Sequence, residues 1–364
     1  MKLTLQRSKL VDGLQIVQNV VAARSTIQIL SNGLMKAADG RLQITATDLE
    51  ITVSCSMDAK VEEEGSTTLP VKLLLSIVRD LQSPEIEIVV DKEDVAYIES
   101  GASSFKINGL SEADFPPLPE SNGKGRYTID QKTFKEMLRK TSYAASLDET
   151  RRVLNGVLLS FKEGKLTMVA TDGRRLALVE QEIDFPADAE VEMVLPSKAV
   201  NELLHILADE GELVIVNQGN QVMFEFGEVV MYSRLIDGVY PNYRLVIPSG
   251  SEEHVSIERE PLLFAIRSVS RMTTDKSNST RFTFADNQVN IQTVNQDRGS
   301  ARVVVPIKYS GNQLDITFNP EYVMDPLRNL ETDEVTIDLT DSHSPAVFRC
   351  NQPFLYVLMP LRTN

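Results

Sequence analysis

The chain has 364 residues, of which 42% are apolar and 24% charged, and its formal net charge is −15. This length allows two or three domains, each with its own hydrophobic core. Two cysteines, Cys55 and Cys350, are too few for a disulfide framework or a thiolate metal site. No apolar run approaches the roughly 20 residues of a membrane span, and the start of the chain lacks a signal-peptide pattern, so we expect a cytoplasmic protein without a membrane partner.

Residues 1–121 are predicted to form a first domain with two helices, each followed by strands. A helix is expected over 5–24, and the alternating stretch "GRLQITATDLEITVSCSM" after it is typical of half-buried antiparallel strands. A second helix, over 70–82, opens at Pro70, where the N–H that proline lacks would have no partner. Its spacing predicts an apolar face of Leu74, Ile77, Val78 and Leu81, and a polar face of Lys72, Ser76 and Arg79.

Residues 122–248 repeat this order as a second domain. A helix over 128–143 is followed by "GKLTMVATDGRRLALVEQEI", and a helix over 196–210 opens at Pro196. In the second of these helices the apolar face is Val200, Leu203, Leu204 and Leu207, with Lys198 on the polar face. In the first, the apolar side is Phe134, Met137, Leu138 and Thr141 and the cationic side is Lys132, Lys135, Arg139 and Lys140.

Residues 249–364 form the third predicted domain, with helices over 255–271 and 320–330. The latter opens at Pro320 and keeps Met324 and Leu327 on its apolar face. The first helices of the three domains begin near Leu3, Tyr127 and Val255, so the offsets are 124 and 128 residues. The repeat predicts an α+β protein of three similar domains, each with two helices packed on antiparallel sheets.

The charge is unevenly divided among these elements. The six helical stretches hold 14 Lys and Arg against 11 Asp and Glu, a net of +3, which leaves −18 for the remainder. Such a division suits helices that face a polyanion, although −15 overall argues against nucleic acid. Charged outer stripes are usually just solvated faces, however, so the counts alone favour ordinary solvated helix faces.

One charged break interrupts a predicted strand. In "TMVATDGRRLALVEQ", Thr167 to Gln181, the residues from Asp172 to Arg175 separate two apolar stretches, and "ATD" also occurs at Asp48, 124 residues earlier. The break is interpreted as a catalytic acid, the lip of a binding pocket or a simple turn. For Asp48 we favour the turn.

Five segments resemble one family, the bacterial DNA polymerase III beta subunits or sliding clamps. They are "ATDGRRLA", "RRVLNGVLL" at 151–159, "SEADFPPLP" at 111–119, "LIDGVYPNYRLVIP" at 235–248 and "YVLMPLR" at 356–362. The resemblance covers the whole chain and implies the DNA clamp fold, closed head-to-tail by a second copy into a ring dimer around double-stranded DNA. It implies a processivity factor of the DNA polymerase III holoenzyme, with the catalytic subunit, the clamp loader, other polymerases and repair proteins as partners.

The resemblance also implies three sets of site residues. The residues expected to face DNA are Arg24, Lys72, Arg79, Lys132, Lys135, Arg139, Lys198 and Arg267. The expected partner-peptide cleft comprises Leu154, Thr171, Gly173, Arg174, Arg175, Leu176, Pro241, Val246, Val357, Met359, Pro360, Leu361 and Arg362, which makes the Asp172 break the lip of a pocket. The expected dimer interface includes Phe105, Arg271 and Met272. Arg151 and Arg152 are left open between DNA and partners.

An enzyme is not indicated. The three histidines, His205, His254 and His343, lie in no recognisable catalytic motif, and there is no phosphate-binding glycine loop or zinc-ligand spacing. We therefore expect no catalytic residues, no metal and no cofactor. The alternative to a clamp is a repeat-built interaction scaffold that does not bind DNA.

Overall fold

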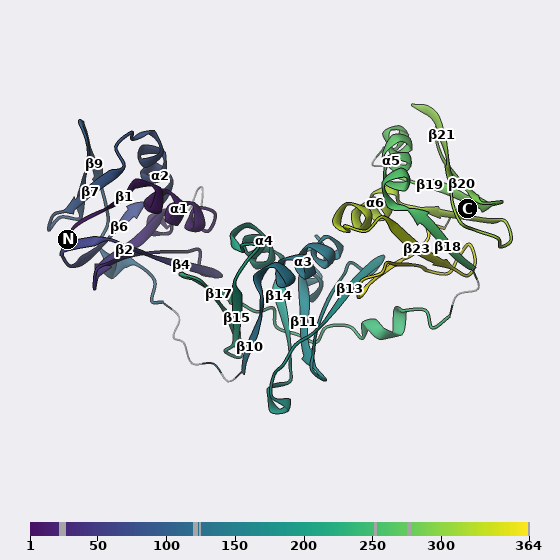
Figure 1. Cartoon of the computed structure of the whole chain (residues 1–364), viewed down its shortest axis with the longest axis horizontal. Coiled ribbons are helices and arrows are strands. Elements are labelled where there is room, and N and C mark those ends of the chain that lie inside the picture. Colours follow the sequence, from purple (N-terminus) through teal and green to yellow (C-terminus); the bar gives the residue numbers. More distant parts are fainter. Residues whose placement is uncertain (22–26, 119–122, 124, 251–252, 275–277, 363–364) are drawn as a thin grey trace. The chain divides into compact units, whose positions relative to one another are not determined.

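The computed structural model describes the chain apart from residues 22–26, 119–122, 124, 251–252, 275–277 and 363–364 (Figure 1). It consists of two compact units: Met1–Phe134 with Asn201–Leu235 (unit 1), and Lys135–Val200 with Ile236–Asn364 (unit 2). Both units include part of the predicted middle domain, so the domain boundaries after residues 121 and 248 stay predictions. Within the described ranges, no helix is long and apolar enough to cross a membrane.

All six predicted helices are present, each shorter than its predicted range. Every one begins directly after a strand or one residue later, and the side chain of Asn319 caps the last helix by accepting a hydrogen bond from the Glu321 N–H at 3.0 Å. The helices α1 and α2 pack on one another in unit 1, as α5 and α6 do in unit 2 (Figure 1). The bounds are α1 (Arg7–Val17), α2 (Val71–Asp80), α3 (Gln131–Thr141), α4 (Ser197–Ile206), α5 (Arg259–Val269) and α6 (Pro320–Asn329).

The predicted apolar faces are confirmed. Ile77 and Leu204 are half-buried, and the other residues of these faces are buried. The prediction that Lys140 lies on the exposed cationic face of α3 is wrong, because its side chain is buried and the residue is only 8% exposed. Its Nζ donates to Gln352 Oε1 at 2.6 Å and lies 3.6 Å from a carboxylate oxygen of Glu136. The long lysine stem carries the ammonium away from the polar stripe, which spacing along the helix does not reveal.

Unit 1 contains two sheets whose neighbouring strands are antiparallel. The five-stranded sheet has the order β5 (Lys60–Glu63), β1 (Lys2–Gln6), β7 (Glu85–Val90), β8 (Val95–Ser100), β9 (Ser103–Asn108). The eight-stranded sheet has the order β10 (Gly125–Asp130), β15 (Glu212–Asn217), β16 (Gln221–Phe226), β17 (Val229–Arg234), β4 (Ile51–Asp58), β3 (Arg41–Thr47), β2 (Asn32–Ala38), β6 (Gly65–Pro70).

Unit 2 has an eight-stranded and a four-stranded sheet. The larger has the order β14 (Val191–Pro196), β11 (Gly156–Lys162), β12 (Lys165–Thr171), β13 (Arg175–Glu182), β25 (Phe354–Leu358), β24 (Ala346–Arg349), β23 (Glu334–Leu339), β18 (Glu253–Glu258). The smaller has the order β21 (Gly299–Pro306), β20 (Gln288–Asn295), β19 (Thr280–Ala285), β22 (Leu314–Phe318).

The two eight-stranded sheets share one topology, with unit 2 read from β18 to β14. In each, four strands of one repeat join four strands of the repeat before it, through β17 and β4 in unit 1 and through β25 and β13 in unit 2. The central pairs match in register, since Tyr232 lies opposite Thr52 and Val357 lies opposite Leu176. Every position near this junction in one unit therefore has an equivalent in the other.

Candidate functional site

The charged break at Asp172 is a tight turn between β12 and β13. The Asp172 carboxylate accepts hydrogen bonds from the backbone N–H groups of Arg174 at 2.9 Å and Arg175 at 3.1 Å. The Thr171 hydroxyl donates to the Arg175 carbonyl at 2.6 Å and accepts from Gly173 N–H at 3.1 Å. Gly173 has φ +83°, which glycine adopts without strain. Because backbone N–H groups of the turn occupy the Asp172 carboxylate, the catalytic-acid interpretation is not supported.

Arg175, which the sequence placed in the partner-peptide cleft, has its head group held by contacts within the protein. Its side chain is 9% exposed and forms ion pairs with Asp172, at 3.0 Å, and with Asp325 of α6. A third nitrogen donates to the Tyr143 carbonyl at 2.6 Å, and the guanidinium lies over the Tyr322 ring, 4.1 Å from its centroid. Arg175 therefore stabilises the turn from its buried side. The sequence could not identify Tyr143 and Asp325 as partners, because they lie 32 and 150 residues away along the chain.

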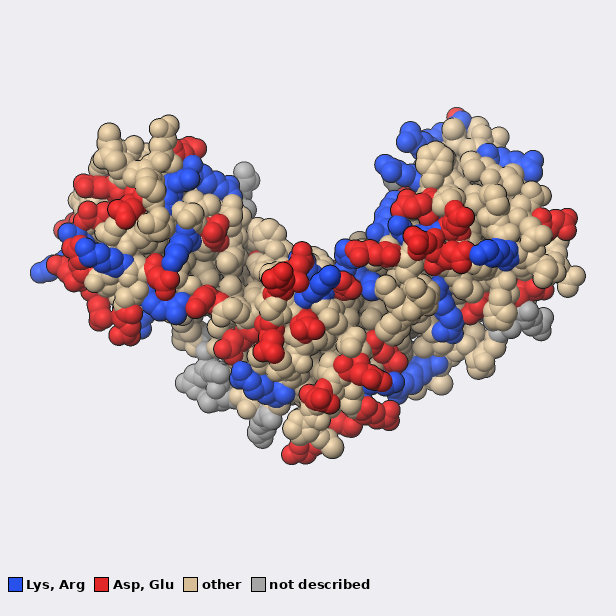
Figure 2. All heavy atoms as spheres, viewed as in Figure 1, with Lys and Arg blue, Asp and Glu red and all other residues tan. Residues whose placement is uncertain are grey.

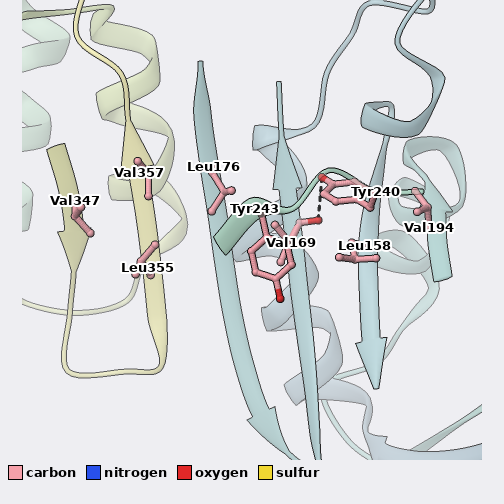
Figure 3. Close-up of a cluster of buried hydrophobic side chains, with 9 residues drawn as sticks. All are labelled: Leu158, Val169, Leu176, Val194, Tyr240, Tyr243, Val347, Leu355 and Val357. Carbon is pink, nitrogen blue, oxygen red and sulfur yellow. Dashed lines mark hydrogen bonds between the residues drawn. The ribbon is translucent and has the colours of Figure 1, made fainter. Parts of the chain in front are cut away.

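Aromatic side chains that the sequence analysis overlooked form the floor beside this turn. Tyr240 and Tyr243 lie across the strands of the larger sheet in unit 2, with Leu176 of β13 and Val357 of β25 in the same buried cluster (Figure 3). The Tyr240 hydroxyl donates to the Val169 carbonyl at 3.4 Å, and burial raises its pKa, which keeps the donor proton in place. The signal was the spacing of two tyrosines in "VYPNYRLV", which holds the connecting segment onto the sheet.

The predicted cleft residues divide into buried and exposed groups. Leu176 and Val357 are 2% and 3% exposed and belong to the floor, while Leu154, Thr171 and Pro360 are half-buried. Met359 is held beside the turn, since its N–H donates to the Arg174 carbonyl at 3.0 Å. That exposed group comprises Gly173, Arg174, Pro241, Val246, Met359, Leu361 and Arg362.

Arg151 lies beside the same turn. One of its terminal nitrogens donates to the Asp172 carbonyl at 3.3 Å, and a Cβ added to Gly173 would lie 3.2 Å from that nitrogen. Arg152 is exposed and follows it in the short helix Arg152–Leu154. The position of Arg151 favours a role in binding partners at this turn.

The predicted DNA-facing cations differ in their exposure to solvent and in their ion-pair partners. Lys72 and Arg79 on α2, Lys132 on α3 and Arg267 on α5 are exposed, and none of the four has a carboxylate partner in the described part of the chain. Lys198 is exposed and Lys135 half-buried. Arg139 is different, because it forms an ion pair with Glu331 at 2.5 Å that largely neutralises its charge. Arg24 lies outside the described residues.

The six helices carry a positive excess. They contain 12 Lys and Arg against seven Asp and Glu, a net of +5, although the whole chain carries −15. Figure 2 shows Lys and Arg beside α2 in unit 1 and beside α5 in unit 2, and over the rest of this face of each unit Asp and Glu are mixed with further Lys and Arg. The helix faces are thus the surfaces best suited to a polyanion.

The predicted dimer residues lie near two sheet edges. Phe105 is 38% exposed on β9, which is the edge strand of the five-stranded sheet. Arg271 is exposed and Met272 half-buried in the short helix that follows α5, and β21 is the edge of the four-stranded sheet. Both edges can accept another strand, because their outer backbone groups have no partner strand in the described chain.

The histidines do not form a catalytic group. His205 is exposed on α4, and His254 lies in β18 with Nδ1 2.7 Å from an Asp338 carboxylate oxygen. His343 Nδ1 is 2.6 Å from Ser342 Oγ, but the Asp341 carboxylate beside them is hydrogen-bonded to backbone N–H groups. No cluster of three or more potential metal ligands occurs among the residues the structure describes.

Comparison with known proteins decides the family. Models of the DNA polymerase III beta subunit match three parts of the chain: the N-terminal domain over residues 1–119, the central domain over 128–242 and the C-terminal domain over 244–362. The chain belongs to the beta sliding clamp family. Its members are non-catalytic accessory subunits of DNA polymerase III, and so is this protein.

Individual clamps match from end to end. The beta sliding clamp of Chlamydia muridarum is 31% identical over 364 residues, with both chains covered completely. The sliding clamp of Bartonella birtlesii, solved with griselimycin bound, has 35% identity and a TM-score of 0.95, and that of Bacillus subtilis has 29% identity and a TM-score of 0.96. Both structures cover all of this chain and are covered by it, so the clamp fold predicted from the sequence is confirmed.

Proposed function

We propose that this protein is a DNA sliding clamp that encircles duplex DNA as a head-to-tail ring of two chains. The observation that carries the proposal is the match of all three clamp domains along the full chain. A closed ring is held on DNA by its topology and needs no contact with the bases. Its lining needs only modest positive charge, and the helix excess of +5 within an acidic chain meets that requirement.

The strongest candidates among the proposed DNA-facing residues are those whose charge is exposed and unpaired. Lys72, Arg79, Lys132 and Arg267 satisfy both conditions in the described chain. Lys135 and Lys198 stay in the proposed set on their position along the same helices, and Arg24 stays in it by family resemblance. Arg139 contributes least, because its partner Glu331 returns the local charge to zero.

Ring closure is proposed to join the β9 edge of one chain to the β21 edge of its partner. Edge strands that expose unpaired backbone groups are templates for strand addition. Phe105 on β9 and Met272 beside β21 supply apolar contacts, and Arg271 supplies a polar one. The proposed oligomer is therefore a homodimer.

Partner binding is proposed at the exposed apolar surface beside the Asp172 turn. Met359 and Leu361 are 44% and 37% exposed, and Val246 is 53% exposed. A flexible methionine beside aliphatic side chains suits peptides of differing sequence. The proposed ligands are short segments of DNA polymerase III, the clamp loader and repair proteins. The proposed location is the cytoplasm, where the bacterial chromosome is replicated.

A retention experiment tests the clamp. The protein is loaded by a clamp loader onto nicked circular DNA, and the bound fraction is measured before and after the circle is cut. We expect retention on the circle and loss from the linear form. Equal retention on both forms would contradict topological binding and favour ordinary surface binding, and no binding to either would favour the scaffold that does not bind DNA.

A further inference from the structure

Unit 1 holds a pocket at the position equivalent to the proposed peptide cleft of unit 2. Its volume is about 200 Å³, and its walls are formed by Thr47, Leu49, Glu50, Thr52, Pro116, Pro117, Gln221, Tyr232, Ser233 and Arg234. All of these residues belong to unit 1. The cavity is smaller than the roughly 300 Å³ at which small-molecule sites begin, so it suits one or two side chains of a peptide.

Matching hydrogen bonds support the equivalence of the Asp48 turn in unit 1 and the Asp172 turn in unit 2. The Asp48 carboxylate accepts from the backbone N–H groups of Glu50 at 3.0 Å and Ile51 at 2.9 Å, which reproduces the Asp172 turn. Arg234 N–H donates to the Glu50 carbonyl at 3.0 Å, as Met359 N–H does to the Arg174 carbonyl. Arg234 is therefore the equivalent of Met359.

The connecting segments also correspond. Phe115 and Tyr240 are each 8% exposed, and each is followed by a proline, Pro116 or Pro241. Both aromatic side chains belong to buried clusters that hold the segment onto its own unit. The wall of the pocket made by Pro116 and Pro117 is thus fixed in place.

The side chains give this pocket a chemistry of its own. Leu49 has φ +75°, a conformation that costs a residue with a Cβ on the order of 1 kcal/mol, and it stands where unit 2 has Gly173. Its side chain is 46% exposed at the mouth of the pocket. Arg234 is exposed and forms no ion pair within the described ranges. An apolar lip and an unpaired cation thus stand at one opening, with the exposed Glu50 carboxylate on the same wall.

We propose that this pocket is a second docking site, which binds a short extended peptide with an aliphatic or aromatic side chain followed by a carboxylate. The apolar side chain enters between Leu49, Pro116 and Tyr232, and the carboxylate pairs with Arg234. The exchange of Met359 for Arg234 at equivalent positions makes the two docking surfaces select different peptides. The proposal uses the proposed cleft only for this comparison, because every residue that lines the pocket belongs to unit 1.

A titration of the full-length protein tests the site. The probe is a fluorescein-labelled, C-terminally amidated peptide, Gly-Ser-Leu-Phe-Asp, followed by fluorescence anisotropy. Leu49→Gly removes the apolar lip with a residue that adopts positive φ freely, and we expect about fivefold to tenfold weaker binding. Arg234→Gln removes the cation and should weaken binding about fivefold. Arg281→Gln, at an exposed arginine of β19 in unit 2, is the matched control and should change nothing.

A cleft variant separates this proposal from the proposed function. Met359→Asp should abolish binding of a Gln-Leu-Ser-Leu-Phe peptide and leave the Gly-Ser-Leu-Phe-Asp probe unaffected. If instead Met359→Asp alone weakens the probe, or if Arg281→Gln weakens it as much as Arg234→Gln, the second site is refuted. Absence of saturable binding up to about 1 mM would refute it as well. A lower sedimentation mass for Leu49→Gly would show that the pocket is occupied by a second copy of the chain. That result would overturn the peptide proposal.

Discussion

At the residue scale, Arg175 shows how a motif can be recognised while the role of one member is misjudged. Its guanidinium joins two carboxylates and a carbonyl under the Asp172 turn. Removing it leaves Asp172 and Asp325 with side chains that are 14% and 21% exposed and have lost their main cation. A carboxylate stripped of its partner in such a setting is costly.

Arg175→Ala should therefore destabilise the fold by about 2 to 4 kcal/mol, and not merely weaken a peptide contact. The measurement is urea unfolding at one fixed protein concentration, because dimer formation adds to apparent stability. Arg174→Ala is the control, since its exposed side chain has no ion-pair partner in the described chain, and it should stay within about 0.5 kcal/mol. Equal stability of the two variants would show that the network under the turn contributes nothing.

Glu202 on α4 gives a second prediction at this scale. It is 7% exposed, and one of its carboxylate oxygens has no hydrogen-bond partner among the described atoms. Burial raises its pKa to about 7, although a hydrogen bond from Asn19 opposes the rise. Because the folded-state pKa lies above the ordinary value, the folded chain holds this proton more tightly than the unfolded chain. The contribution to stability is complete below about pH 4.5 and is lost as the pH rises through 7.

Glu202→Gln should therefore stabilise the protein by about 1 to 3 kcal/mol near pH 8 and by almost nothing near pH 4.5. The amide keeps the shape of the protonated acid without its charge. Unfolding curves at several pH values measure the difference, with Glu210→Gln, at an exposed residue just beyond the helix, as the control. A gain that is the same at every pH would mean that the buried charge is not the cause.

At the element scale, α2 allows folding and DNA binding to be tested separately, because one of its faces packs in the core and the other carries the proposed DNA-facing cations. Val71, Leu74, Leu75 and Val78 are buried on one side, and Lys72 and Arg79 are exposed on the other. Changing both cations to Glu should leave the melting temperature almost unchanged and shorten retention on nicked circular DNA, most clearly at low salt, where screening is weak. Lys36→Glu with Lys92→Glu, at two exposed lysines outside the helices, makes the same change in net charge and is the control. Unfolding of the α2 variant would disprove the assignment of its faces.

The segment after β25 can be tested without removing it. Deleting Met359 onward would also remove the backbone hydrogen bonds from Met359 to Arg174 and from Leu361 to Thr317. Met359→Ala with Leu361→Ala keeps those bonds and removes apolar surface. Affinity for a Gln-Leu-Ser-Leu-Phe peptide should fall about ten- to a hundredfold while the solution mass is unchanged. Unaltered affinity would reject the proposed cleft.

Elements whose pattern is local could be predicted from the sequence, and side chains that reach other elements could not. The apolar face of α3 follows from spacings of three and four residues, and Asp48 forms the turn that its sequence favoured. Lys140 and Arg175 were misjudged because their long stems end beside Gln352 and Asp325, far away along the chain. The pocket beside Leu49 was missed for the same reason, since four separate segments form its walls.

At the scale of the whole molecule, ring closure and DNA contact are separate properties that act together. The exposed cations of α2, α3 and α5 attract DNA only weakly, so lasting retention depends on the closed ring. In the proposed interface, the edge strands β9 and β21 close the ring. A chain that cannot dimerise should then lose retention with every DNA-facing cation still present.

Phe105→Asp tests this separation. A charge in place of an aromatic anchor at the centre of a strand pair forfeits about 1.5 to 3 kcal/mol of burial and adds a desolvation cost, so dimer affinity should fall at least about a hundredfold. Light scattering should show the mass of one chain, and nicked circular DNA should no longer retain the protein. Leu147→Asp, at a leucine that is 95% exposed in unit 2, should leave the mass unchanged. A Phe105→Asp protein that is monomeric yet still retained on circular DNA would mean that binding does not depend on a closed ring.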